Sequence, residues 1–128
     1  MIVTKRYTFR EKLSWSLYDW ANSVFATTVL AGFFPLFFKS YWAGDLDNAT
    51  STALLGTASS FAGLIIVLIA PLLGAMADLS RKKKVFLSIF ALLGIISTSI
   101  LFFISYGLWQ WSLIIFGLSV IGFSGANI

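Results

Sequence analysis

The 128-residue sequence contains no cysteine and no histidine. Without cysteine, the chain can form no disulfide, no thiolate metal site and no thiol nucleophile. Without histidine, it lacks the commonest metal ligand and the side chain that most readily exchanges protons near neutral pH. We therefore expect no enzyme active site of a familiar kind, no metal site and no cofactor.

Charged residues are also scarce, at 11% of the chain, whereas apolar residues make up 59%. The mean hydropathy is +0.91. This composition is typical of an integral membrane protein and excludes an ordinary soluble domain. We expect the lipid bilayer, and no nucleic acid, as a partner of the chain.

Three long runs without charge set the number of helices. They cover residues 20–38, 48–77 and 85–128. One bilayer crossing takes about 20 residues, so the last run has room for two crossings, separated at Tyr106-Gly107. The sequence predicts an all-α membrane protein with four transmembrane helices, at residues 13–38, 52–77, 85–106 and 108–128, after a cytoplasmic segment of residues 1–12.

The cations gather on one side of these predicted spans. Four precede the first span and four follow the second: Lys5, Arg6, Arg10 and Lys12, then Arg81, Lys82, Lys83 and Lys84. The loop between the two spans has only Lys39, which Asp45 and Asp47 offset. Because cytoplasmic loops are enriched in lysine and arginine, we expect a multi-pass protein of the cell membrane with a cytoplasmic N-terminus.

The second predicted span has one face of small residues, and the fourth span is rich in glycine. At about 100° per residue, the small face collects Gly56, Ser59, Ser60, Gly63, Ala70, Pro71, Gly74, Ala77 and Asp78. Small residues let helix backbones approach closely in lipid, so we expect this face to meet another helix. The contact is either static packing, which the span alone favours, or a sliding contact in a moving protein. The fourth span, with Gly117, Gly122 and Gly125, is expected to line an interface or a cavity.

The first predicted span carries a polar stripe around a single carboxylate. Its candidate cavity-lining residues are Asp19, Asn22, Ser23 and Thr27, which share one side of the helix. A polar stripe in a membrane helix normally faces protein or water rather than lipid. Asp19 either lines such a cavity or is an interfacial carboxylate that is solvated from the cytoplasm.

The most informative segment joins the second and third predicted spans. It runs Gly74-Ala75-Met76-Ala77-Asp78-Leu79-Ser80 and continues with the four cations of residues 81–84. Four consecutive cations cannot enter hydrocarbon, so they mark a tight cytoplasmic turn. Asp78 lies directly before them, where it can act as a latch at the end of a helix.

This segment resembles the cytoplasmic signature of the major facilitator superfamily, which also lies between a second and a third span. The resemblance implies a gating motif that holds the cytoplasmic side closed in the outward-facing state, formed here by Gly74, Asp78, Arg81, Lys82 and Lys83. Two positions depart from the family pattern. Leu79 stands where the family usually has arginine, and Arg81 stands where it has glycine.

Residues 14–23 and 25–28 resemble, more narrowly, the vacuole-effluxer branch of that superfamily, named for amino-acid efflux. The two resemblances imply a secondary active transporter that moves a small solute, with amino acids and protons as candidate ligands, by alternating access. Family members have twelve spans, built from three-helix repeats. The chain is then expected to be a fragment with the first four helices, and the remaining helices of the transporter are its partners.

Two other functions stay open at the level of the sequence. A small four-span proton-coupled drug exporter acting as a dimer also fits the length and Asp19, although residues 74–84 are foreign to that class. A non-transporting scaffold subunit of the membrane is the second alternative. Such a subunit would need no polar stripe in its first span.

The absence of cysteine gives a direct test of orientation, because any introduced thiol is the only one in this chain. With a cytoplasmic N-terminus, Asn48→Cys reacts with an impermeant thiol reagent in intact cells, whereas Ser80→Cys does not. Labelling is measured on each variant before and after the cells are opened. The reversed pattern would refute both the orientation and the cytoplasmic placement of residues 74–84.

Overall fold

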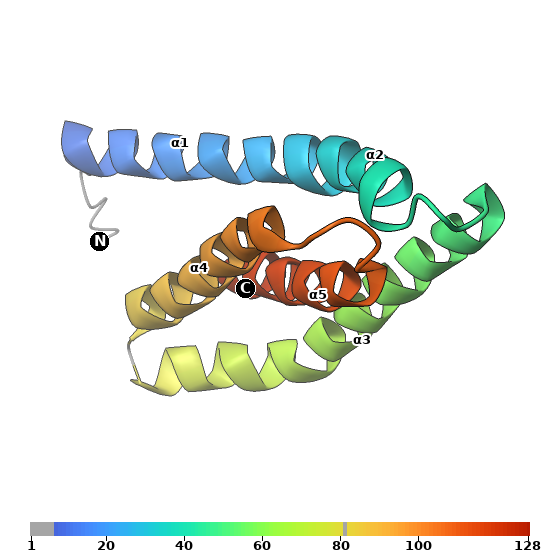
Figure 1. The fold of residues 1–128 in the computed structure, drawn as a ribbon. Helices are drawn as coiled ribbons and strands as arrows, with labels where there is room; N and C mark the ends of the chain where they lie inside the picture. The colour runs from blue at the N-terminus through green and yellow to red at the C-terminus, as the bar shows by residue number, and fades with distance from the viewer. Residues whose placement is uncertain (1–6, 81) are drawn as a thin grey trace. The chain divides into compact units, whose positions relative to one another are not determined.

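The computed structural model describes residues 7–80 and 82–128, and these residues contain helices but no strand. The first helical stretch combines α1 (Phe9–Val24), a π-helical segment (Phe25–Phe33), the short α2 (Phe34–Phe37) and a second π-helical segment (Phe38–Trp42). It is followed by α3 (Asn48–Ser80), α4 (Lys83–Ile100) with a final 3₁₀ turn (Leu101–Phe103), and α5 (Trp109–Ala126) (Figure 1).

Four helical stretches of the described chain are long and apolar enough to cross a bilayer. They are Phe9–Trp42, Asn48–Leu79, Lys83–Phe103 and Trp109–Ala126. The predicted all-α membrane fold with four spanning helices is thereby confirmed. The break predicted in the last charge-free run is also present, because the helix ends at Phe103 and Gly107 has a φ of +80°, a conformation that favours glycine.

The chain divides into two compact units, residues 1–34 and residues 35–128. In the first unit, Glu11 accepts a hydrogen bond from the backbone N–H of Thr8 at 2.7 Å and so closes the N-terminus of α1. The helix changes from α to π geometry at Phe25. Pro35 gives a physical reason, because it donates no N–H and its ring crowds the carbonyl four residues earlier, which favours a wider turn.

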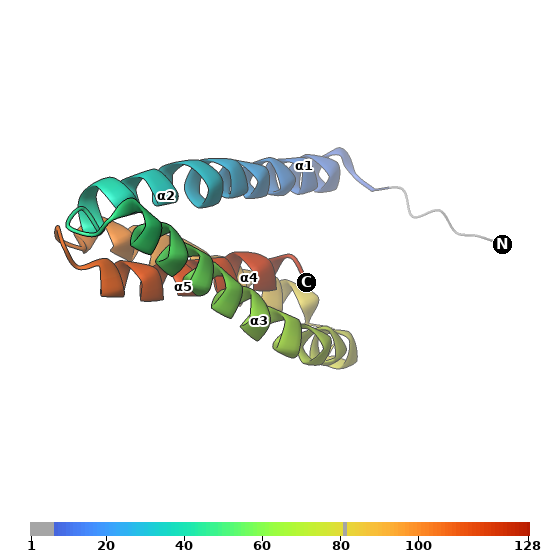
Figure 2. The same cartoon turned by 90° about the vertical axis from the view of Figure 1, so that its right-hand side faces the viewer.

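The second unit is held together by the packing of α4 against α5, which lie side by side in both views (Figures 1 and 2). A Cβ atom at Gly122 would lie 2.7 Å from the Cα of Gly94 and 2.9 Å from the carbonyl oxygen of Phe90. A Cβ atom at Gly125 would overlap the ring of Phe90. The two backbones therefore touch along the glycine-rich side of α5. In contrast, Gly117 faces open space among the described residues.

Helix α3 packs against α5, and its buried residues Ser51 and Ala62 share one face of the helix. This is not the small-residue face predicted from the sequence. A Cβ atom at Gly56, Gly63 or Gly74 would meet no atom of the described residues within 4 Å. The partner expected for the small-residue face is therefore absent from the second unit, and its contact with another helix remains a prediction.

Helix α3 bends in its second half, along the yellow-green part of the ribbon in Figure 1. Pro71 lies inside this helix. A proline removes one helical hydrogen bond and pushes away the carbonyl one turn earlier, which bends the helix. The segment after Pro71 carries Gly74 and Asp78, so the bend sets the direction of the predicted gating motif.

Two loops of the second unit are joined by a polar and aromatic clasp formed by Trp42, Asp45, Ile104 and Tyr106. The indole Nε1 of Trp42 donates to the carbonyl of Ile104 at 3.1 Å, and the hydroxyl of Tyr106 donates to Asp45 at 3.2 Å. The negative charge of Asp45 raises the pKa of Tyr106, because ionised tyrosine would be repelled there. The clasp ties the end of the first helical stretch to the connection between α4 and α5.

Asp47 is not part of the clasp and instead caps the start of α3. Its carboxylate accepts a hydrogen bond from the backbone N–H of Thr50 at 3.1 Å, which satisfies a donor in the first helical turn. Hydrogen bonds from Thr50 lower the pKa of Asp47. The two acidic residues that offset Lys39 in the sequence therefore also hold the structure of this loop.

The space beside each glycine differs across the contact of α4 with α5, and this difference predicts which substitutions lower stability. Gly122→Ala places a methyl group against the α4 backbone and should lower the free energy of unfolding by about 1–3 kcal/mol. Gly117→Ala on the same helix, and Gly94→Ala across the contact, where the nearest atom is 3.5 Å away, should be nearly neutral. Unfolding of the purified variants in detergent measures the difference. Equal loss in all three would mean that helix α5 does not approach α4 in this way.

Candidate functional site

The predicted gating motif lies where α3 ends at Ser80 and α4 begins at Lys83. The carbonyl of Lys82 accepts hydrogen bonds from the backbone N–H groups of Val85 at 2.9 Å and Phe86 at 3.3 Å, which starts α4 directly after the turn. Arg81 lies outside the described residues. One long helix therefore ends and another begins beside the four cations, and the tight cytoplasmic turn remains a prediction.

Asp78 forms an ion pair with Lys83 across this turn. Both side chains are largely exposed, Asp78 at 67% and Lys83 at 72%. Exposed pairs add little to stability because water solvates both charges well when they separate. The structure therefore pairs Asp78 with a cation from its own turn, and this contact can open at little cost in free energy.

Gly74, the first residue of the motif, lies one turn before Asp78 on α3 and is half-buried. An added Cβ atom at this position would meet no described atom within 4 Å. The contacts of the second unit do not explain why glycine stands here. A steric requirement for glycine at position 74 would arise only if another helix approached this part of α3.

The polar stripe of the first unit lies on the α1 helix and on the π-helical segment after it. Asp19 and Ser23 are exposed, and Asn22 is half-buried. The hydroxyl of Thr27 donates to the carbonyl of Ser23 at 2.9 Å, one turn earlier. The hydroxyl of Thr27 is therefore already hydrogen-bonded to the helix backbone, as is common for threonine in membrane helices.

The π-helical segment changes the geometry that the sequence predicts for this stripe. The prediction assumed 100° per residue throughout, but a π-helix bonds residues five apart and advances less per residue. The bond from the backbone N–H of Phe34 to the carbonyl of Val29 shows this spacing. Thr27 is consequently closer to the side of Asp19 than an α-helix would place it. The sequence alone gave no signal for this change except Pro35.

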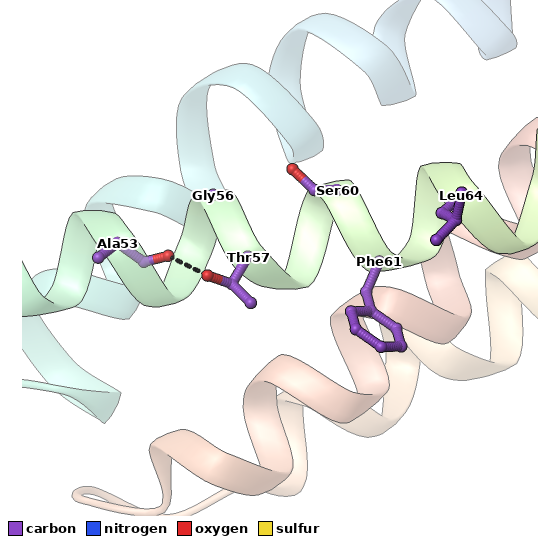
Figure 3. Close-up of a pocket in the computed structure, with 6 residues that line it drawn as sticks. All are labelled: Ala53, Gly56, Thr57, Ser60, Phe61 and Leu64. Carbon is purple, nitrogen blue, oxygen red and sulfur yellow. Dashed lines mark hydrogen bonds between the residues drawn. The ribbon is translucent and has the colours of Figure 1, made fainter.

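A shallow groove of about 450 Å³ runs along the first half of α3, and sequence reasoning did not identify it as a site. Figure 3 shows the residues that line it, all of which belong to α3: Ala53, Gly56, Thr57, Ser60, Phe61 and Leu64. The hydroxyl of Thr57 donates to the carbonyl of Ala53 at 2.8 Å. Gly56 and Ser60 come from the predicted small-residue face, so the groove is a surface left open where that face lacks a neighbour.

The described residues contain no group of three or more acidic side chains that could hold a metal ion. The polar interactions at the predicted site residues are the ion pair of Asp78 with Lys83 and the hydrogen bond from Thr27 on the first helical stretch. Both belong to elements long and apolar enough to span a membrane.

Comparison with known proteins gives a bacterial protein of similar sequence. The chain is 42% identical, over 125 residues, to an uncharacterized MFS-type transporter, YxiO, of Bacillus subtilis strain 168. The aligned part covers 97% of this chain and 29% of the relative. This similarity supports membership of the major facilitator superfamily. No family model and no solved structure matches the chain.

Residues 74–84 span the end of the second helical stretch and the start of the third, and their role as the superfamily signature remains a prediction. The chain spans less than a third of the length of this relative. It is therefore related to one part of a transporter, and a fold of four membrane helices is consistent with such a part.

Proposed function

We propose that this chain belongs to a secondary active transporter that moves a small solute across the cell membrane by alternating access. The observation that carries the proposal is the 42% identity to an MFS-type transporter over nearly the whole chain. The resemblance of residues 74–84 to the superfamily signature also supports it, because these residues span the end of α3 and the start of α4, where the proposal places a cytoplasmic gate.

In this proposal, Gly74, Asp78, Arg81, Lys82 and Lys83 form the cytoplasmic gate. Alternating access requires contacts that form in one state and break in the other. The exposed pair of Asp78 and Lys83 fits this requirement because little free energy holds it closed. When another helix end approaches, Asp78 is able to exchange Lys83 for a partner on that helix.

We further propose that the polar stripe of the first unit lines the transport cavity. Asp19 would bind the amine of a substrate or carry a coupling proton, and Asn22, Ser23 and Thr27 would supply hydrogen bonds. The resemblance of residues 14–28 to the vacuole-effluxer branch favours amino acids as the substrate class. The other walls of the cavity would come from helices beyond this chain.

The gate is tested by Asp78→Asn in the full-length protein, because this change keeps the shape of the side chain and removes its charge. We expect transport to fall by about fivefold or more, because the coupling between two sites of a protein is typically of this size. The amount of protein in the membrane and its unfolding temperature should stay near normal, since the pair is exposed. Transport is measured in vesicles with a panel of labelled amino acids.

Asp45→Asn is the matched control for this experiment. Asp45 is also an exposed loop carboxylate, and asparagine keeps an oxygen that accepts the hydrogen bond from Tyr106. The control should transport normally. If Asp78→Asn transports as well as the control does, Asp78 is a solvated helix end and has no role in gating.

The cavity is tested by Asp19→Asn, which should reduce transport and flatten its dependence on pH. A carboxylate that binds an amine or a proton loses both abilities when it becomes an amide. Ser14→Ala is the control, because Ser14 lies roughly 140° around the same α-helix and its hydroxyl already donates to the carbonyl of Arg10 at 2.9 Å. Thr28 is unsuitable as a control, since the π-helical segment moves it away from the opposite side.

Equal effects of Asp19→Asn and Ser14→Ala would identify the stripe as a packing surface rather than a cavity wall. A normal pH dependence in Asp19→Asn, together with reduced transport, would exclude proton coupling at this residue but retain substrate binding. The two substitutions are measured at several pH values in the same vesicles.

A further inference from the structure

The turn between α3 and α4 carries more positive charge than the described residues around it neutralise. Lys82, Lys83 and Lys84 are consecutive, and all three are exposed. Asp78 is the carboxylate of this turn, and it pairs with Lys83. The first turn of α4 contains no acidic residue. Lys82 and Lys84 are therefore left with no carboxylate partner in the part of the chain that the structure describes.

These lysines surround a concave surface rather than projecting from a flat one. A groove of about 530 Å³ is lined by Asp78, Lys82, Lys83, Lys84 and Val85. The combination of a concave shape and an excess of lysine charge favours a ligand that is anionic.

The position of the groove in the fold indicates where such an anion would come from. It lies where two helices that are able to span a membrane meet, at the level expected for lipid headgroups. Val85, which lines the groove, is 51% exposed, and Leu79, the residue after Asp78, is 86% exposed. A free phosphate would neutralise the lysines but leave these apolar side chains in water, whereas a phospholipid covers both kinds of surface.

We propose that Lys82 and Lys84 bind the phosphate of an anionic phospholipid, while Lys83 stays paired with Asp78. The lipid glycerol and upper acyl chains lie against Leu79 and Val85. Lysine stems are apolar along their length, so they rest on this surface while their ammonium groups reach the phosphate. The inference rests on charge, shape and membrane level, and it holds whatever solute the protein moves.

The experiment measures lipid binding to the purified full-length protein in a neutral detergent by native mass spectrometry. Short-chain phosphatidylglycerol is the probe, and phosphatidylcholine is the uncharged comparison. Lys82→Gln with Lys84→Gln should weaken phosphatidylglycerol binding by about thirtyfold, since each lysine near an anionic lipid surface contributes about a factor of five. Lys82→Arg with Lys84→Arg keeps both charges and should retain the affinity, which shows that the turn tolerates substitution.

The matched control is Arg10→Gln with Lys12→Gln, which removes the same charge from exposed positions of α1. This variant should bind phosphatidylglycerol nearly as well as the unmodified protein. Equal weakening in the two neutralised variants would overturn the proposal in favour of general charge attraction. Equal binding of phosphatidylcholine would also overturn it.

Inorganic phosphate distinguishes the two sources of the anion. If the groove is a lipid site, millimolar phosphate should leave phosphatidylglycerol bound, because phosphate cannot replace the contacts with Leu79 and Val85. Displacement of the lipid by phosphate at that concentration would identify a soluble anion as the ligand and overturn the lipid assignment.

Discussion

Close approach of two backbones is the constraint on which the second unit depends. Lipid tails are as apolar as leucine, so helices in a bilayer associate through fit rather than through exclusion of water. Gly122 allows that fit, because its missing side chain lets α5 reach the Cα of Gly94 and the carbonyl of Phe90. Helix α3 also packs on α5, and the clasp of Trp42, Asp45, Ile104 and Tyr106 joins the adjoining loops.

The number and class of the helices were predictable from charge alone. A charged residue inside hydrocarbon is costly, so the ends of uncharged runs mark the ends of spans with few exceptions. The break in the longest run was also predictable, because that run is too long for one crossing and contains Gly107. Gly107 adopts a positive φ, a conformation that other residues avoid. The turn at residues 81–84 follows from the same argument, since four cations need water on at least one side.

Contacts between distant residues were not predictable in the same way. The glycine content of the last span indicates an interface, but only the fold shows that Gly122 meets Gly94 while Gly117 faces open space. The motif places Asp78 next to four cations and does not say that Lys83 is its partner. The π-helical segment moves Thr27 around the helix, and the periodicity used to define the polar stripe assumes that no such segment exists.

The structure places a tight contact and a loose contact at different points of the same helical unit. The contact of Gly122 with Gly94 leaves no room for a methyl group on Gly122, so α4 and α5 are closely packed there. The pair of Asp78 with Lys83 is exposed and lies beyond the bend at Pro71, on a helix end with little packing around it. Alternating access needs helices that move together as a rigid body. It also needs a contact at the edge of that body that breaks at little cost in free energy. The gating role proposed for Asp78 rests on this separation between a close contact of α4 with α5 and an exposed ion pair between α3 and α4.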